Sequence, residues 1–146
     1  EKIIQKLYQA SNAGVSVKLL VRGNCSIMAG VKNLSQNIEV YGIIDRYLEH
    51  SRILIFGNGG NEKYFIGSAD LMERNFDSRI EVYAPIYDAD IQKQLRRTIE
   101  YGLSDNTKAR VVDGTGSNEL HKTGDDKPFR SQEELYKFYK EQMQTN

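Results

Sequence analysis

The chain has 146 residues, enough for one domain that buries about 70 percent of the surface exposed by its unfolded form. Twenty basic and twenty acidic side chains cancel, which excludes an overall field that attracts polyanions, so any attraction for phosphate must be local. The single cysteine, Cys25, excludes an intrachain disulfide framework and fits a reducing compartment. Because the chain begins at Glu1 and lacks a long apolar run, we expect it to be part of a larger protein.

The first third of the chain is predicted to alternate helix and strand. Arg22 lies where a strand gives way to a loop, a common position for a functional side chain. The predicted elements are a helix over residues 2–12 closed by Gly14, a strand over 15–21, a loop over 22–37 and a strand over 38–44.

A β-hairpin is predicted next, with strands over residues 53–56 and 64–66 around the turn Asn58-Gly59-Gly60-Asn61. The start of the first strand of an antiparallel hairpin lies beside the end of the second. We therefore expect two pairs of polar side chains to lie close together, and the turn register, which the sequence leaves open, decides whether they share a face. The pairs are His50 with Arg52 and Ser68 with Asp70.

The rest of the chain continues the α/β pattern. We predict a strand over residues 80–86 ended by Pro85 and a helix over 88–103 capped by Asp88. A short strand over 108–112 and a mobile polar loop over 114–127 are expected to follow. The last predicted helix begins at Ser131, and Glu134 completes a capping box there.

The side chains at the base of the hairpin are an imidazole, a guanidinium, a hydroxyl and a carboxylate. Phosphoryl chemistry needs donors for charged oxygens and a group that carries a proton, because most of its catalysis is positioning and electrostatics. Arginine and histidine meet these needs near neutral pH. Each charge-assisted hydrogen bond from arginine to phosphate contributes roughly 1.5 to 3 kcal/mol.

Structural interpretations of the same residues stay open. Asp70 and Arg74 are four residues apart and can pair with each other, and Arg52 can hold a carboxylate such as Glu49 or Asp45 instead of phosphate. Ser68 and Gly67 can serve close backbone packing alone. Outside the hairpin, His121 is predicted to be solvated in its polar loop, and Cys25 has no histidine near it in the sequence to act as its base.

The motif His50-x-Arg52 followed by Gly67-Ser68-x-Asp70 resembles the His-x-Lys and Gly-Ser-x-Asn signature of the phospholipase D superfamily. With the flanking segments LVRGNCS at 20–26, SQNIEVYGIIDRYLEHSRI at 35–53 and IGSADLMERNFDSRIEVYAPI at 66–86, the chain is similar to the last domain of bacterial polyphosphate kinases. The resemblance continues through DNTKARVVDG at 105–114 and FRSQEELY at 129–136, so it covers essentially the whole chain.

This resemblance implies roles for particular residues. Arg22 and His50 would contact the ATP phosphates, with His50 as the catalytic residue, and Arg79 would line the same site. Arg52, Ser68, Asp70 and Arg74 would support them. The phosphorylated histidine, the magnesium-binding arginines and the adenine-stacking aromatic of the family belong to preceding domains, so Mg²⁺ would come with ATP and no metal ligands are expected here.

The resemblance also implies a fold and an activity: one α/β, phospholipase-D-like domain over residues 1–146 with a mixed β-sheet flanked by helices, and reversible transfer of the terminal phosphoryl group of ATP to polyphosphate. The implied partners are ATP or ADP, inorganic polyphosphate, the preceding domains and further copies of the enzyme, with no nucleic acid. The enzyme would be cytoplasmic, with membrane association of the full-length form, and the isolated chain would be inactive.

Two other classes of function stay open. A phosphodiesterase or nuclease would pair two copies of this domain, but such enzymes place an aspartate where Gly57 stands and a lysine where Arg52 stands, which disfavours hydrolysis. A noncatalytic module that binds polyanions or drives oligomerisation would show salt-sensitive binding without nucleotide preference.

Overall fold

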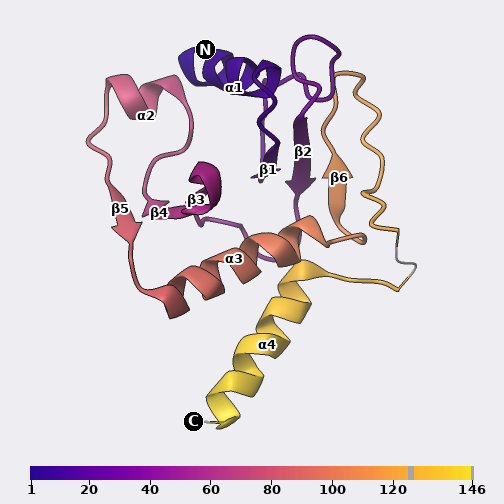
Figure 1. Cartoon of the computed structure of the whole chain (residues 1–146). Coiled ribbons are helices and arrows are strands. Elements are labelled where there is room, and N and C mark those ends of the chain that lie inside the picture. Colours follow the sequence, from indigo (N-terminus) through magenta and orange to yellow (C-terminus); the bar gives the residue numbers. More distant parts are fainter. Residues whose placement is uncertain (125–126, 146) are drawn as a thin grey trace. The chain divides into compact units, whose positions relative to one another are not determined.

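The computed structural model describes residues 1–124 and 127–145 and divides into two compact units (Figure 1). The first unit combines Glu1–Glu49 with Ile99–Asn146, and the second, which we call the hairpin unit, is His50–Thr98. Each unit contains one three-stranded sheet. The expectation that residues 1–146 form one domain stays a prediction.

A mixed sheet in the order β1-β2-β6 forms the centre of the first unit. Strand β1 (Val17–Val21) runs parallel to β2 (Ile38–Ile43), and β6 (Ala109–Val111) runs antiparallel to β2. Figure 1 shows the three strands side by side. The mixed sheet and the α/β class predicted from the sequence are therefore confirmed.

One face of this sheet carries the main apolar core. Ile38 and Val40 alternate on β2 and are almost fully buried together with Ala29. Helix α1 (Lys2–Asn12) packs Leu7 and Tyr8 against them. The amphipathic pattern predicted for residues 2–12 thus defines the helix that covers this face.

Two helices complete the first unit. The last turn of α3 (Ala89–Leu103) brings Gly102 against Leu20 and Ile43, so that a Cβ at Gly102 would lie 2.5 Å from a methyl carbon of Leu20. Helix α4 (Ser131–Thr145) begins where Asp105 accepts hydrogen bonds of 2.8 Å from both the N–H and the Oγ of Ser131. The predicted capping box is wrong, because the Ser131 hydroxyl bonds to this buried carboxylate.

The hairpin unit contains an antiparallel sheet in the order β3-β4-β5. Strand β3 (Ile53–Phe56) pairs with β4 (Lys63–Gly67), with Ile53 opposite Ile66. The turn between them contains a short 3₁₀ segment, η1 (Asn58–Gly60), in which Gly59 and Gly60 have φ of 63° and 94°. Glycine adopts positive φ without steric cost, which explains why the turn contains the two glycines from which the hairpin was predicted.

Strand β5 (Tyr83–Ile86) begins three residues later than predicted and continues past Pro85. Pro85 is tolerated because β5 lies at the edge of the sheet and pairs only with β4. Residues 80–82 lie outside the strand, and Ile80 is fully exposed. The sequence also did not predict helix α2 (Glu73–Asp77), which is too short to show a helical period.

The N-terminus of α3 is capped as predicted. The Oδ1 of Asp88 accepts hydrogen bonds from the N–H groups of Asp90 at 2.9 Å and Ile91 at 3.0 Å. In the described part of the chain, no helix is both long and apolar enough to cross a lipid bilayer.

Candidate functional site

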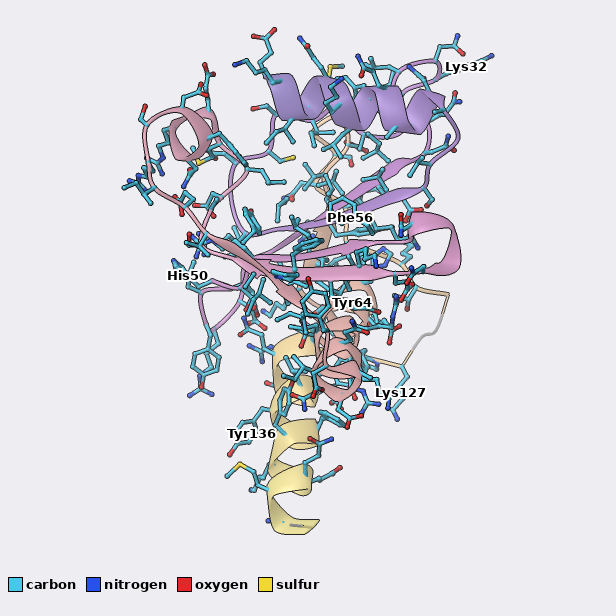
Figure 2. All side chains as sticks on the ribbon, turned by 60° about the vertical axis from the view of Figure 1, so that its left-hand side comes forward. Lys32, His50, Phe56, Tyr64, Lys127 and Tyr136 are labelled. Atoms are coloured by element: carbon cyan, nitrogen blue, oxygen red, sulfur yellow. The ribbon has the colours of Figure 1, made fainter. Side chains whose placement is uncertain are left out.

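Arg52 connects the two polar pairs predicted at the base of the hairpin. Its Nη1 lies 2.7 Å from Nδ1 of His50 and donates to the His50 carbonyl at 3.0 Å. Its Nε donates to Oδ1 of Asp70 at 3.1 Å in a partly buried ion pair. Figure 2 shows His50 at the end of the hairpin opposite the turn. The predicted proximity of His50, Arg52 and Asp70 is confirmed, and the carboxylate held by Arg52 is Asp70.

The contact with Arg52 also selects the tautomer of His50. A guanidinium can only donate hydrogen bonds, so Nδ1 of His50 must be the acceptor. In the neutral ring the proton therefore resides on Nε2. Nε2 itself lies 3.5 Å from the same Nη1, and its N–H can donate a hydrogen bond to a phosphate oxygen.

Ser68 belongs to a second network, which the sequence did not predict. Its hydroxyl donates a short hydrogen bond to Oε2 of Glu81, and the amide of Asn75 donates to Oε1 at 2.6 Å. The register explains the separation of Ser68 from Arg52: Arg52 accepts a bond from the Gly67 N–H, so Ser68 lies one position further and projects to the other face.

The pKa of the Glu81 carboxyl is lowered by the hydrogen bonds from Ser68 and Asn75, against a smaller opposing effect of burial, and the positive charges of Arg79 and Arg52 lower it further. Asn75 is buried, and its Oδ1 has no hydrogen-bond partner in the part of the chain that is described. Nothing in the sequence marks Glu81 as different from other charged residues in an apparent strand.

The two remaining arginines of the hairpin unit differ from Arg52. Arg79 is exposed between α2 and β5, and within residues 1–124 and 127–145 it forms no hydrogen bond or ion pair. Its charge acts on Glu81. Arg74 is exposed on α2, and the ion-pair partner of Asp70 is Arg52. Arg79 thus presents a guanidinium that is available to a ligand.

Arg22 lies in the first unit, directly after β1. Its Nη1 donates to the carbonyl oxygen of Glu49 at 2.8 Å, which fixes a side chain that would otherwise move freely at the end of the strand. His50 and Arg79 lie in the hairpin unit. Convergence of Arg22 with these two residues therefore stays a prediction, as do their roles.

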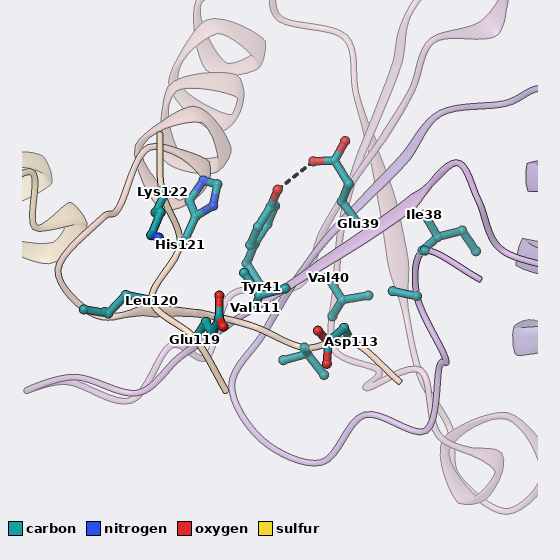
Figure 3. Close-up of a pocket in the computed structure, with 13 residues that line it drawn as sticks. Ile38, Glu39, Val40, Tyr41, Val111, Asp113, Glu119, Leu120, His121 and Lys122 are labelled. Carbon is teal, nitrogen blue, oxygen red and sulfur yellow. Dashed lines mark hydrogen bonds between the residues drawn. The ribbon is translucent and has the colours of Figure 1, made fainter. Parts of the chain in front are cut away.

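His121 is only partly exposed, whereas the sequence predicted a fully solvated side chain. Its ring lies 4.1 Å from that of Tyr41, centre to centre, and its Nε2 donates to the Leu103 carbonyl at 3.0 Å. Both rings line an open cavity of about 390 Å³ on the sheet of the first unit (Figure 3). There, the pKa of Tyr41 is raised to about 12, and burial is the largest cause. A 2.6 Å hydrogen bond from the Tyr41 hydroxyl to Glu39 and the negative charge of Glu39 contribute to the same increase.

The described residues contain no group of three or more His, Cys, Asp or Glu side chains that could hold a metal ion. The described part of the polar loop over 114–127 is mostly exposed, and its backbone pairs at one point with β6 through Arg110 and Leu120. Residues 125 and 126 of that loop lie outside the described residues, and its mobility stays a prediction.

Comparison with known proteins defines the class first. The chain superposes on the crystal structure of polyphosphate kinase from Porphyromonas gingivalis with a TM-score of 0.93 and 40% sequence identity, covering 100% of this chain and 22% of that one. The fold is thus the phospholipase-D-like α/β fold of that enzyme class, as expected from the sequence.

The sequence comparisons give the family. Polyphosphate kinases from Vibrio vulnificus and Escherichia coli are 44% and 42% identical to this chain over 138 residues, which is 94% of this chain and 20% of each relative. The family described as polyphosphate kinase C-terminal domain 2 matches residues 1–132. The chain belongs to this family, and it spans about a fifth of the length of these relatives.

Proposed function

We propose that this chain is the C-terminal phosphate-binding part of a longer polyphosphate kinase. That enzyme would transfer the terminal phosphoryl group of ATP reversibly to inorganic polyphosphate through a phosphohistidine in another domain. The observation that carries the proposal is the support of His50 by Arg52 and Asp70, because it leaves a directed Nε2–H donor on the ring. Family membership gives the reaction class.

Within this proposal, three side chains meet the phosphates. Arg22 and Arg79 hold phosphate oxygens by charge-assisted hydrogen bonds, and His50 contacts the nucleotide phosphates and stabilises the charge that develops on transfer. Arg52 and Asp70 position His50. Ser68 acts through Glu81, whose negative charge offsets the repulsion between the positive charges of Arg52 and Arg79. Arg74 adds a further positive charge to the hairpin unit.

Magnesium enters this proposal only with the nucleotide. As the family resemblance implies, the ligands for Mg²⁺ would come from ATP itself and from other domains. The contribution of this chain is positioning and charge. Alone it lacks the phosphorylated group, and we expect no turnover from it.

We infer that the full-length enzyme works in the cytoplasm as a homo-oligomer, with ATP or ADP, polyphosphate and its own preceding domains as partners. The single cysteine supports a reducing compartment. Membrane association of the full-length form and the exclusion of nucleic acid are part of the same proposal and rest on family resemblance.

The decisive experiment compares His50→Gln with wild type in ATP-dependent polyphosphate synthesis by the full-length enzyme. Glutamine keeps a polar side chain of similar length but lacks the imidazole ring that Arg52 holds, so we expect a loss of at least about 100-fold in kcat. His121→Gln is the matched control, because His121 is the other histidine of the chain. A folded His50→Gln enzyme with wild-type turnover would reduce this domain to a noncatalytic polyanion-binding module.

A further inference from the structure

A cationic cavity lies on the first unit. It has a volume of about 430 Å³ and is open to solvent. Its positive side chains are Lys108 and Arg110, and among the described residues no carboxylate belongs to its wall. The lining residues are Gly23, Gly42, Ile44, Thr107, Lys108, Arg110, Val112 and Asn118.

The sheet explains how the cavity forms. On β2, Ile38, Val40 and Gly42 alternate onto the face that α1 covers, and Gly42 is paired with Arg110 of β6. The same face therefore changes from buried aliphatic side chains to a glycine opposite an arginine. Because Gly42 has no side chain, the space above it stays open, and a Cβ there would lie 3.3 Å from a methyl carbon of Val112.

The two cations are not neutralised nearby. Within residues 1–124 and 127–145, neither Lys108 nor Arg110 pairs with a carboxylate, and Nη1 of Arg110 donates only to the Asn118 carbonyl at 3.3 Å. Lys108 makes a small contribution to the lowered pKa of Asp45, whose carboxylate already accepts bonds of 2.9 and 2.6 Å from Arg130. The charge of the cavity is thus free for an anion from solution.

The acidic residues of the neighbouring segment lie elsewhere. Asp113 and Glu119 line the cavity of about 390 Å³ to which Tyr41 and His121 also belong (Figure 3). This separation of acidic from basic side chains keeps the site locally positive although the chain as a whole has no net charge.

The cavity continues from the position of Arg22. Gly23 follows Arg22 directly and forms part of the wall. Strands β1 and β2 are parallel, so their carboxyl ends meet at one edge of the sheet, the usual location of ligands in α/β folds. An anion held by Arg22 therefore has this cavity beside it.

We propose that the cavity is a binding subsite for the polyphosphate chain, which takes phosphate groups beyond those held by Arg22. This inference rests on the proposed function. Lys108 and Arg110 are two residues apart, about 7 Å along an extended strand, so one linear polyanion can contact both. None of the lining residues is aromatic, which favours a phosphate chain over an adenine ring as the occupant.

The test uses the full-length enzyme with the double substitution Lys108→Ala and Arg110→Ala. We expect the KM for long-chain polyphosphate, measured in the direction of ATP formation, to rise about tenfold or more, while the KM for ADP and the kcat stay unchanged. Binding of fluorescent polyphosphate should also become less steeply dependent on salt. The charge-preserving pair Lys108→Arg and Arg110→Lys should keep the wild-type KM, which separates loss of charge from misfolding.

The matched control removes two other exposed lysines of the same unit, Lys2 and Lys32, and should leave every KM unchanged. A wild-type KM for polyphosphate in the folded double alanine variant would overturn the subsite, and an equal rise in the KM for ADP would reassign the cavity to the nucleotide. Failure of the wild-type enzyme to make polyphosphate would instead overturn the proposed function.

Discussion

Nη1 of Arg52 lies 2.7 Å from Nδ1 of His50, while Nε of the same guanidinium donates to Asp70 at 3.1 Å. One planar group thus fixes both the position and the tautomer of the imidazole. A lysine in this position would present a single ammonium and could not hold both partners in a fixed geometry.

We predict that Arg52→Lys lowers kcat of the full-length enzyme by about tenfold or more although it keeps the positive charge. The physical reason is loss of the fork that positions His50, since a displacement of about 1 Å costs up to about 100-fold in rate. Steady-state kinetics with ATP would measure it. Arg97→Lys, on α3, is the control and should leave kcat unchanged; equal kinetics for both variants would mean that Arg52 supplies charge alone.

Asp70 should act through Arg52 rather than on the substrate. Asp70→Asn removes the negative partner of the ion pair, and because both side chains are partly exposed we expect less than about 1 kcal/mol loss of stability. We predict a fall in kcat of about tenfold with little change in KM for ATP, together with a shift in the pH profile of kcat, because the charges around His50 change. An unchanged pH profile together with a large loss of stability would make Asp70 only structural.

The sequence could predict the hairpin and the group His50, Arg52 and Asp70 because its turn residues and strand periods are local signals. It could not predict that Ser68 would face Glu81, because a register difference of one residue moves a side chain to the other face. Asp105 was also missed. A single aspartate after a helix gives no sign that it will be buried and bonded to the start of a helix 26 residues later.

Gly67 should be sensitive to any side chain. A Cβ at this position would lie 2.3 Å from a ring carbon of Tyr83, whose hydroxyl donates to the Ala69 carbonyl at 2.9 Å. We predict that Gly67→Ala destabilises the chain by about 1 to 3 kcal/mol, because the ring must move and release the segment that leads to Asp70. Urea unfolding would measure the change. Gly57→Ala is the control on the same hairpin, since nothing lies within 4 Å of its Cβ, and a loss as large there would contradict the argument.

Asp105 should be one of the residues on which the first unit depends most. Its fully buried carboxylate accepts bonds from the backbone N–H groups of Thr107 and Lys108 at 2.9 and 2.7 Å, and from Ser131 as described above. Asp105→Ala leaves these donors buried without an acceptor, so we predict a loss of about 3 to 5 kcal/mol in the free energy of unfolding. Asp113→Ala, which removes a partly exposed carboxylate that also bonds to its own turn, should cost much less.

The same carboxylate should make the stability of the chain depend on acid. Burial acts to raise the pKa of Asp105, but the hydrogen bonds from Lys108, Ser131 and Thr107 outweigh it and hold the pKa below its ordinary value. The unfolded chain therefore binds the proton first as the pH falls, and the stabilisation, complete above about pH 5, is lost below about pH 4 and down through the pKa of the folded state. In urea unfolding between pH 7 and pH 3, the difference in stability between wild type and Asp105→Asn should be constant above about pH 5 and should narrow below about pH 4. A difference that stays constant down to pH 3 would mean that another carboxylate causes the acid sensitivity.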